Sequence, residues 1–278
     1  MRVVYLDRVD STNDEAFRRL EAGEAAHLDL LVAREQTAGR GRRGRAWVGS
    51  PGESFLGSLV LMGADADDLP GPSLLSMAAG VALVDAAEEV GVAREDLALD
   101  WPNDLVALGP DGWGGHRARG DGTGDGPGSD EVPAPVGEAP KLAGILVEAR
   151  SLDPAAPVYV VGLGVNLLQR TFPAELLAER PVASLAQLGA PVEPERFAPV
   201  LGRCLAEAVT LGRNDPSELC ARYLDATRLG GLEVELELAG GRPRGRLVFA
   251  EPDGLGLLDD EDGLLRFALE HVLAIRPA

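Results

Sequence analysis

Short apolar runs alternate with amphipathic stretches along the first half of the chain, and this pattern predicts strands and helices in one α+β unit. Runs typical of buried strands lie at 3–6, 28–33 and 55–62. A cluster of Ser, Thr and Asn followed by acids predicts a capped helix from residue 10 to about residue 22. Helical periodicity returns at 70–90, and a short strand at 97–99 leads into a turn-forming Trp-Pro-Asn-Asp stretch.

The second half of the chain changes its hydrophobic period near residue 230. Before that point, two apolar runs at 142–148 and 158–165 predict a pair of adjacent strands in a hairpin. Helical segments are expected at about 173–188, 194–212 and 215–227. After Gly230 the period becomes two, with short runs at 233–238, 246–249, 254–258 and 264–267. Short strands separated by glycine turns indicate a small β-barrel.

Residues 109–139 are dominated by Gly, Pro and acids and offer almost nothing to bury. This composition predicts a flexible surface insertion. The chain therefore divides into a main domain over 1–228, interrupted by this insertion, and a small barrel over 229–278.

The formal net charge of −19 argues against general nucleic-acid binding, because phosphate backbones repel such a surface. No apolar run approaches the roughly 20 residues of a membrane span, and the N-terminus does not read as a signal peptide. Cys204 and Cys220 are expected to be buried thiols in a reducing compartment. The three histidines are scattered, so no protein metal site is expected. We expect a cytoplasmic protein.

Lys141 is the only lysine, whereas arginine occurs 25 times. Isoleucine and asparagine are also rare, which indicates a genome that disfavours these residues. A retained lysine then marks a place that needs a compact ammonium on a flexible stem, which a planar guanidinium cannot replace. A chance survivor on the surface is the alternative.

The segment 39–45 reads Gly-Arg-Gly-Arg-Arg-Gly-Arg and matches the G-x-G-x-x-G pattern of dinucleotide-binding turns. That motif needs a helix directly afterwards, and here the sequence continues as loop, so we reject it. Four arginines supply positive charge directly, as bidentate donors to phosphate oxygens. Such a loop should be mobile until an anion neutralises it. A solvated basic turn or an RNA contact remains the alternative.

Lys141 stands at the start of a predicted strand with Gly144 close behind, and the partner strand ends in Gly162-Leu163-Gly164-Val165-Asn166. Glycine in a strand admits close approach of another group, so the two strands look like the floor of a pocket. The Ser-Thr-Asn cluster at 11–13 fits a helix cap and equally a set of polar ligand contacts. Tryptophans at 47 and 101 are more typical of core or loop anchors than of ligand platforms.

Taken together and in order, five motifs resemble those of biotin protein ligases. They are Asp-Ser-Thr-Asn at 10–13, Gln-Thr-Ala-Gly-Arg-Gly-Arg-Arg-Gly-Arg-x-Trp at 36–47, Trp-Pro-Asn-Asp at 101–104, Lys-Leu-Ala-Gly-Ile-Leu at 141–146 and Gly-x-Gly-x-Asn at 162–166. The resemblance implies a central mixed sheet backed by helices, like class II synthetases, and a C-terminal SH3-like barrel. It also implies the reaction: biotin and MgATP give biotinyl-5′-AMP, and biotin then passes to a lysine of a carboxyl carrier domain of an acyl-CoA carboxylase.

The resemblance also implies roles for individual residues. The implied biotin contacts are Ser11, Thr12, Asn13, Gln36, Arg40, Gly41, Arg42, Trp47, Lys141 and Gly144. The implied nucleotide contacts are Arg42, Arg43, Arg45, Asn103 and Asn166. Lys141, Arg40 and Arg42 are the implied catalytic residues, and Asp104 is a candidate for docking or deprotonating the acceptor lysine.

Three features depart from the family pattern. Many members read Lys before Trp-Pro-Asn-Asp, where this chain has Asp100. The 109–139 insertion is atypical, and the chain begins a few residues before the first motif, so we expect no N-terminal DNA-binding domain. A lipoate-type ligase and a non-catalytic biotin- or carrier-binding module remain the rival interpretations. The sequence leaves a monomer and a homodimer equally open.

Overall fold

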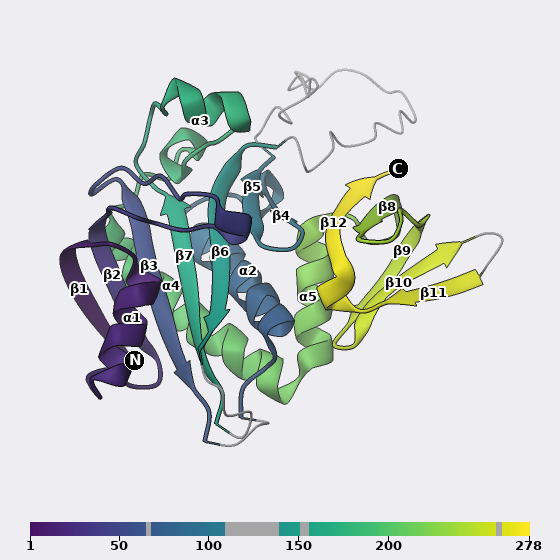
Figure 1. The fold of residues 1–278 in the computed structure, drawn as a ribbon. Coiled ribbons are helices and arrows are strands. Elements are labelled where there is room, and N and C mark those ends of the chain that lie inside the picture. Colours follow the sequence, from purple (N-terminus) through teal and green to yellow (C-terminus); the bar gives the residue numbers. More distant parts are fainter. Residues whose placement is uncertain (65–67, 109–138, 151–155, 260–262) are drawn as a thin grey trace.

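The computed structural model describes residues 1–64, 68–108, 139–150, 156–259 and 263–278, and in these ranges the α+β prediction is confirmed. A seven-stranded mixed sheet has the order β1-β2-β3-β7-β6-β5-β4 (Figure 1). Only β1 and β2 pair in parallel within it. The strands are β1 (Arg2–Val9), β2 (Asp29–Gln36), β3 (Ser54–Met62), β4 (Leu97–Asp100), β5 (Asp104–Ala107), β6 (Lys141–Ala149) and β7 (Val158–Asn166). The predicted insertion lies outside the described residues except for Ala139.

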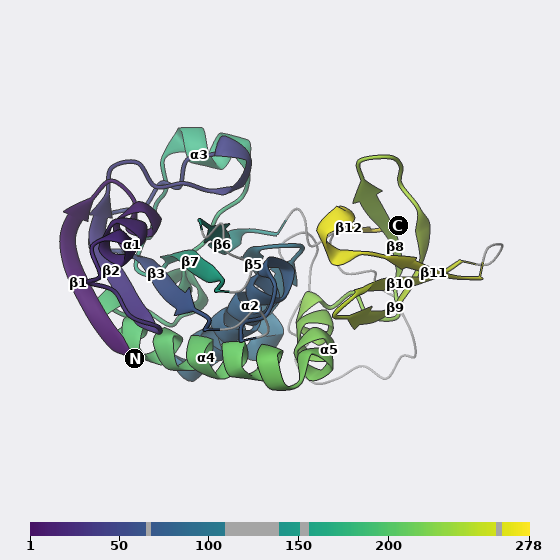
Figure 2. The same cartoon turned by 60° about the horizontal axis from the view of Figure 1, so that its bottom comes forward.

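Helices cover both faces of this sheet because its strands are apolar on both sides. On β2, Leu31 packs in a small cluster with Phe17 of α1 (Thr12–Glu21). The next residue, Val32, belongs to the main core with Phe197 of α4 (Pro194–Asn214). Successive side chains on a strand point to opposite faces, so α1 and α4 lie on opposite sides. Figure 2 shows α4 running below the sheet beside α2 (Pro72–Glu89).

The start of α1 is capped differently from the prediction. Ser11 is the N-cap residue, but its side chain makes no capping hydrogen bond. Instead, Gln36 Oε1 accepts from the Thr12 N–H at 2.7 Å, and Asp10 Oδ1 accepts from the Ser11 N–H at 2.7 Å. A side chain at the end of β2 thus satisfies a free N–H of the first helical turn, which ties strand and helix together.

Two further expectations were incomplete. The Trp-Pro-Asn-Asp stretch is a turn, but Asp104 also begins β5, and Asp100 faces Asp104 across this β4–β5 hairpin. The helix expected at 173–188 is only α3 (Ala174–Glu179), followed by extended backbone and a 3-10 turn at Leu185–Leu188. Pro181 explains the early end, because a residue before proline is pushed out of helical geometry. Arg180 accordingly has φ −165° and ψ 156°.

The C-terminal strands form a five-stranded antiparallel sheet with the order β11-β10-β9-β8-β12. They are β8 (Glu233–Leu238), β9 (Arg244–Glu251), β10 (Gly254–Asp259), β11 (Gly263–Phe267) and β12 (Val272–Pro277). The sequence reading missed β12. Among the described residues no backbone pairing joins the outer strands β11 and β12, so closure into a barrel stays a prediction.

The C-terminal sheet is joined to the main sheet through α5 (Pro216–Thr227) and the β4–β5 turn (Figure 1). Trp101 Nε1 donates to the Val272 carbonyl at 2.8 Å, and the Trp101 ring meets Tyr223 of α5 edge-on at 5.7 Å between centroids. Arg276 of β12 reaches Asp100 at 3.2 Å. Trp101 is therefore a buried anchor, as predicted, and it connects the two sheets.

The two cysteines are buried free thiols, as predicted, and burial raises the pKa of Cys204 and of Cys220 to about 11. Within the described ranges, no helix is both long and apolar enough to span a membrane.

Trp101→Phe should destabilise the protein without removing the aromatic packing. Phenylalanine cannot donate to the buried Val272 carbonyl, so we expect a loss of about 1–3 kcal/mol in the free energy of unfolding. Urea titration monitored by circular dichroism measures it. Leu264→Ala, which truncates an exposed side chain, serves as the control and should change stability by less than about 0.5 kcal/mol. Equal effects of the two substitutions would contradict the anchoring role of Trp101.

Candidate functional site

Three glycines on β6 and β7 leave room for neighbouring side chains on the face of the sheet that carries α1. Gly144 and Gly164 are direct partners across the two strands, and Gly162 pairs with Ser58 of β3. A Cβ on Gly162 would collide with the Asn13 side chain, and a Cβ on Gly164 would collide with the Trp47 ring. A Cβ on Gly144 would crowd both Trp47 and the end of Lys141. These glycines are therefore required by the side chains that lie on them.

The polar residues at the mouth of α1 are buried and connected to one another. Thr12 and Asn13 are each 3% exposed. The Ser58 hydroxyl lies 2.7 Å from Thr12 Oγ1 and 2.6 Å from Asn13 Oδ1. Asn13 Nδ2 donates to Glu148 Oε2 at 2.6 Å. Such a network is fixed in orientation, because each buried polar group depends on its partner.

The same mouth includes Ser11, which is 3% exposed, and Gln36, whose carboxamide oxygen holds Thr12. The predicted biotin contacts at 11, 12, 13 and 36 are thus brought together by α1 and the end of β2. The Ser11 side chain does not cap the helix, and the contact of these side chains with a ligand stays a prediction.

The glycine–arginine loop folds back on itself. Arg40 bridges to Ala46, the Gly41 N–H donates to the Arg45 carbonyl at 2.7 Å, and a 3-10 turn spans Arg42–Gly44. No regular helix follows, so the rejected dinucleotide-type turn is absent here. Arg43 sits at φ 56° in the left-handed region, which is uncommon for a residue with a Cβ.

The four loop arginines have different surroundings. Arg40 forms ion pairs with Asp14 of α1 and, at 3.2 Å, with Glu148 of β6. The Arg40 hydrogen bond is the main reason that the pKa of Asp14 lies below its usual range. Arg42 Nη1 donates to Asn103 Oδ1 at 3.2 Å, and burial lowers the Arg42 pKa. Arg43 and Arg45 are exposed and make no ion pair with any described residue, so their predicted phosphate contact stays a prediction.

Lys141 lies at the centre of the site, at the first residue of β6 as the sequence predicts. Its side chain is 17% exposed, and its Nζ lies 2.6 Å from Asp104 Oδ1. The ammonium also lies 5.4 Å from the centroid of the Trp47 ring, within the range of a cation–π contact. Burial lowers the pKa of Lys141, and the Asp104 carboxylate opposes that shift. The chain's one lysine is therefore a largely buried, paired cation.

Asn103 and Asn166 each donate a side-chain hydrogen bond to a backbone carbonyl near Lys141. Asn103 Nδ2 donates to the Ile145 carbonyl at 2.9 Å, and its oxygen accepts from Arg42. Asn166 Nδ2 donates to the Ala183 carbonyl at 3.0 Å. In this structure both amides tie backbone segments around Lys141, while their nucleotide contacts remain predictions.

Three polar residues of the site were not singled out from the sequence. Ser58 and Glu148 end up on the site face because residues at even spacing on a strand share a face, and Glu148 follows Gly144 and Leu146 in that register. Arg180 Nη1 donates to Asp104 Oδ2 at 2.6 Å. It lies in the segment mistaken for helix, so nothing in the pattern indicated it.

The Trp47 ring lies against Gly144 and Gly164, and its Nε1 is buried without a hydrogen-bond partner among the described atoms. Its role as a wall of the biotin site stays a prediction. In the same described part of the chain, no group of three or more His, Cys, Asp or Glu side chains is arranged to hold a metal ion.

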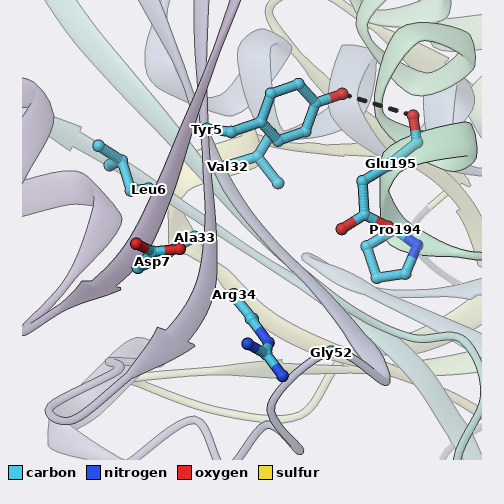
Figure 3. A pocket seen from close by; sticks show the side chains of 9 residues that line it. All are labelled: Tyr5, Leu6, Asp7, Val32, Ala33, Arg34, Gly52, Pro194 and Glu195. Atoms are coloured by element: carbon cyan, nitrogen blue, oxygen red, sulfur yellow. Dashed lines mark hydrogen bonds between the residues drawn. The ribbon is translucent and has the colours of Figure 1, made fainter.

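A separate cavity of about 290 Å³ opens on the α4 side of the sheet (Figure 3). Its lining includes Tyr5, Arg34 and Glu195, with the Tyr5 hydroxyl directed to the Glu195 carbonyl at 3.4 Å. None of the predicted site residues lines it. The cavity lies across the sheet from the glycine-lined face and is distinct from the candidate site.

Comparison with known proteins places this chain among ligases. The profile of the biotin/lipoate A/B protein ligase family matches residues 5–166. A biotin–[acetyl-CoA-carboxylase] ligase of Paracoccus denitrificans is 35% identical over 216 residues, 74% of each chain. A ligase of the same name from Mycobacterium tuberculosis is 30% identical over 264 residues, 94% of this chain and 80% of that one.

The fold agrees. The biotin protein ligase of Aquifex aeolicus, solved with biotin and ATP, superposes with a TM-score of 0.71 at 24% identity, covering 100% of this chain and 99% of that one. The matched motifs, the mixed sheet and the extent of the identity lead to one conclusion: this chain belongs to the biotin/lipoate A/B protein ligase family.

Proposed function

We propose that this protein is a biotin protein ligase, which activates biotin with ATP and transfers it to a lysine of a biotin carboxyl carrier domain of an acyl-CoA carboxylase. The observation that carries the proposal is Lys141, a buried ammonium between Asp104 and the Trp47 ring at the edge of a glycine-lined face. The names of the relatives from Paracoccus and Mycobacterium support the same activity.

Adenylation of biotin needs positive charge where the carboxylate meets the α-phosphate. Formation of an acyl-adenylate joins a carboxylate to the α-phosphate of ATP, so two anions must be brought together and the charge that develops as pyrophosphate leaves must be stabilised. Lys141 supplies a compact ammonium donor, and Arg42 is held near β6 through Asn103, which also donates to the Ile145 carbonyl. Magnesium would arrive with ATP and supply further charge stabilisation at the phosphates.

The buried network at the mouth of α1 suits a ligand ring with donors and acceptors. Thr12, Asn13 and Ser58 form a fixed set of hydrogen-bonding groups beside the glycine floor, with Ser11 and Gln36 at its rim. Trp47 adds an apolar wall. We assign biotin to this space, with the loop at 39–45 closing over it and shielding the mixed anhydride from water.

Two rivals are disfavoured. A lipoate-type ligase belongs to the same broad family, but the two relatives named above carry the name of biotin ligases. A non-catalytic binding module would have no need of a buried lysine paired to an aspartate, together with Arg40 and Arg42. We further propose a cytoplasmic enzyme with a catalytic domain over 1–228 and a C-terminal unit over 229–278.

The purified protein, incubated with biotin, MgATP and a carrier domain, should label that domain, as detected by avidin blot. Lys141→Arg should lose roughly 100-fold in the rate of biotin-dependent pyrophosphate exchange, because a guanidinium cannot occupy the place of the ammonium between Asp104 and Trp47. Arg196→Gln, an exposed substitution on α4, is the control and should keep the wild-type rate. Exchange without biotin, or labelling with lipoate instead, would overturn the assignment.

Gly164→Ala should weaken biotin binding more than ATP binding. A methyl group at this position collides with the Trp47 ring and must push the wall of the proposed biotin site away from the sheet. We expect the KM for biotin to rise about tenfold, the equivalent of roughly 1.4 kcal/mol, in steady-state exchange kinetics. Gly240→Ala, which has open space around it and no left-handed backbone, is the control for changing a glycine elsewhere. An equal rise in both KM values would argue against this placement of biotin.

The 39–45 loop should be cleaved readily in the free enzyme and become protected by ligand. Arg43 is exposed, and the loop carries like charges that an adenylate would neutralise. Limited trypsin digestion, with the cut after Arg43 followed by mass spectrometry, should slow when biotin and MgATP are added together. An unchanged rate of cutting at that bond would contradict a loop that closes over the intermediate.

A further inference from the structure

Arg180 and Lys141 share one carboxylate. Lys141 Nζ lies 2.6 Å from Asp104 Oδ1, and Arg180 Nη1 lies 2.6 Å from Asp104 Oδ2. Both oxygens are engaged by cations from different parts of the chain, so the carboxylate cannot rotate without breaking a charge-assisted hydrogen bond. The Asp104 side chain is only 12% exposed, and the Arg180 side chain is 24% exposed.

The position of Arg180 is set by backbone contacts with Lys141 itself. The Lys141 N–H donates to the Pro181 carbonyl at 3.0 Å, and the Ala183 N–H donates to the Lys141 carbonyl at 2.9 Å. Asn166 holds the same segment through the Ala183 carbonyl. The residues after α3 therefore run alongside the first residue of β6, and Arg180 enters the site in a fixed register with Lys141.

The charges around this pair explain why a second cation is needed. Asp100 lies opposite Asp104 across the β4–β5 hairpin, so two carboxylates face each other in a buried setting. Arg276 of β12 pairs with Asp100 at 3.2 Å, and Arg42 of the loop adds a further positive charge near Asp104. The Tyr223 hydroxyl of α5 stays neutral because burial raises its pKa. With Lys141 as its sole partner, Asp104 would neutralise the ammonium. With two cations on one carboxylate, a net positive charge remains beside the Trp47 wall.

We propose that Arg180 is a positioning residue for the adenylation step: it fixes Asp104 and leaves the Lys141 ammonium with charge to offer to an anionic substrate. This inference rests on the proposed function. Arg180 acts through Asp104, and no contact of Arg180 with the reacting atoms is required.

The test is biotin-dependent pyrophosphate exchange measured across pH for wild type, Arg180→Gln and Arg180→Lys. Arg180→Gln should lower kcat roughly 10- to 100-fold, as expected when a reacting group is misplaced, with little change in the KM for biotin. Arg180→Lys keeps a cation and should restore most of kcat. The exposed variant Arg196→Gln is the matched control and should behave as wild type.

The pH profile separates positioning from simple support of the fold. Lys141 must be protonated to act, so its loss of a proton limits activity at high pH. Arg180 contributes to lowering the pKa of Lys141, after burial as the main cause. Removing the Arg180 charge raises that pKa, and the alkaline limit of the Arg180→Gln profile should therefore move to higher pH. In Arg180→Lys it should stay near the wild-type position.

The outcomes are distinct. Wild-type kcat in Arg180→Gln, or a lower kcat with an unmoved alkaline limit and no recovery in Arg180→Lys, would overturn the role of Arg180 alone. Absence of biotin-dependent exchange in the wild type would overturn the proposed function as well. Arg180→Met, which keeps the aliphatic stem without the charge, carries the same expectations if Arg180→Gln does not fold, and circular dichroism identifies that case.

Discussion

The ion pair between Lys141 and Asp104 is the interaction on which the arrangement of the site depends. It joins β6 to β5: Asp104 pairs with Gly144 and Lys141 with Val106 in this antiparallel pair, and the Lys141 side chain reaches along the strands to the Asp104 carboxylate. Removing one partner from such a buried pair leaves an uncompensated charge, which is more costly than the pair is stabilising. The neighbouring elements are arranged around it: the β4–β5 turn, the segment after α3 and, through Asp100 and Arg276, the C-terminal sheet.

The second constraint is steric. Strands β6 and β7 are central in the sheet, and side chains on both their faces would normally pack against helices. Glycines at 144, 162 and 164 carry no side chains on one face of the sheet, and Asn13 and Trp47 lie where their Cβ atoms would otherwise be. The surrounding core is made of larger apolar residues on the opposite face, such as Leu163 and Val165. The sheet thus carries the side chains of the candidate site on one face and keeps its main hydrophobic core on the other.

Much of this fold was accessible from the sequence, since periodicity identified β1, β2, β3, β6 and β7 and the long helices. The failures share a cause: each missed element is short and fixed by tertiary contacts. Strand β5 has four residues, β12 follows a 3-10 turn, and the extended residues after α3 are held by backbone bonds to Lys141. The gathering of Thr12, Asn13, Lys141 and Asp104 followed from motif recognition. Glu148 required the register of the sheet, and Arg180 required the backbone contacts of the segment after α3 with Lys141. Periodicity alone contains neither.

The uniqueness of Lys141 has a consequence for the enzyme's own surface. An acyl-adenylate that escapes into solution acylates amines, and lysine side chains are the usual targets on a protein. In this chain the only lysine is buried against Asp104, and arginine, whose guanidinium stays protonated and is a poor nucleophile, provides the rest of the basic surface. The basic surface of this ligase is therefore built of arginine, and its one lysine amine lies in the site itself, paired with Asp104.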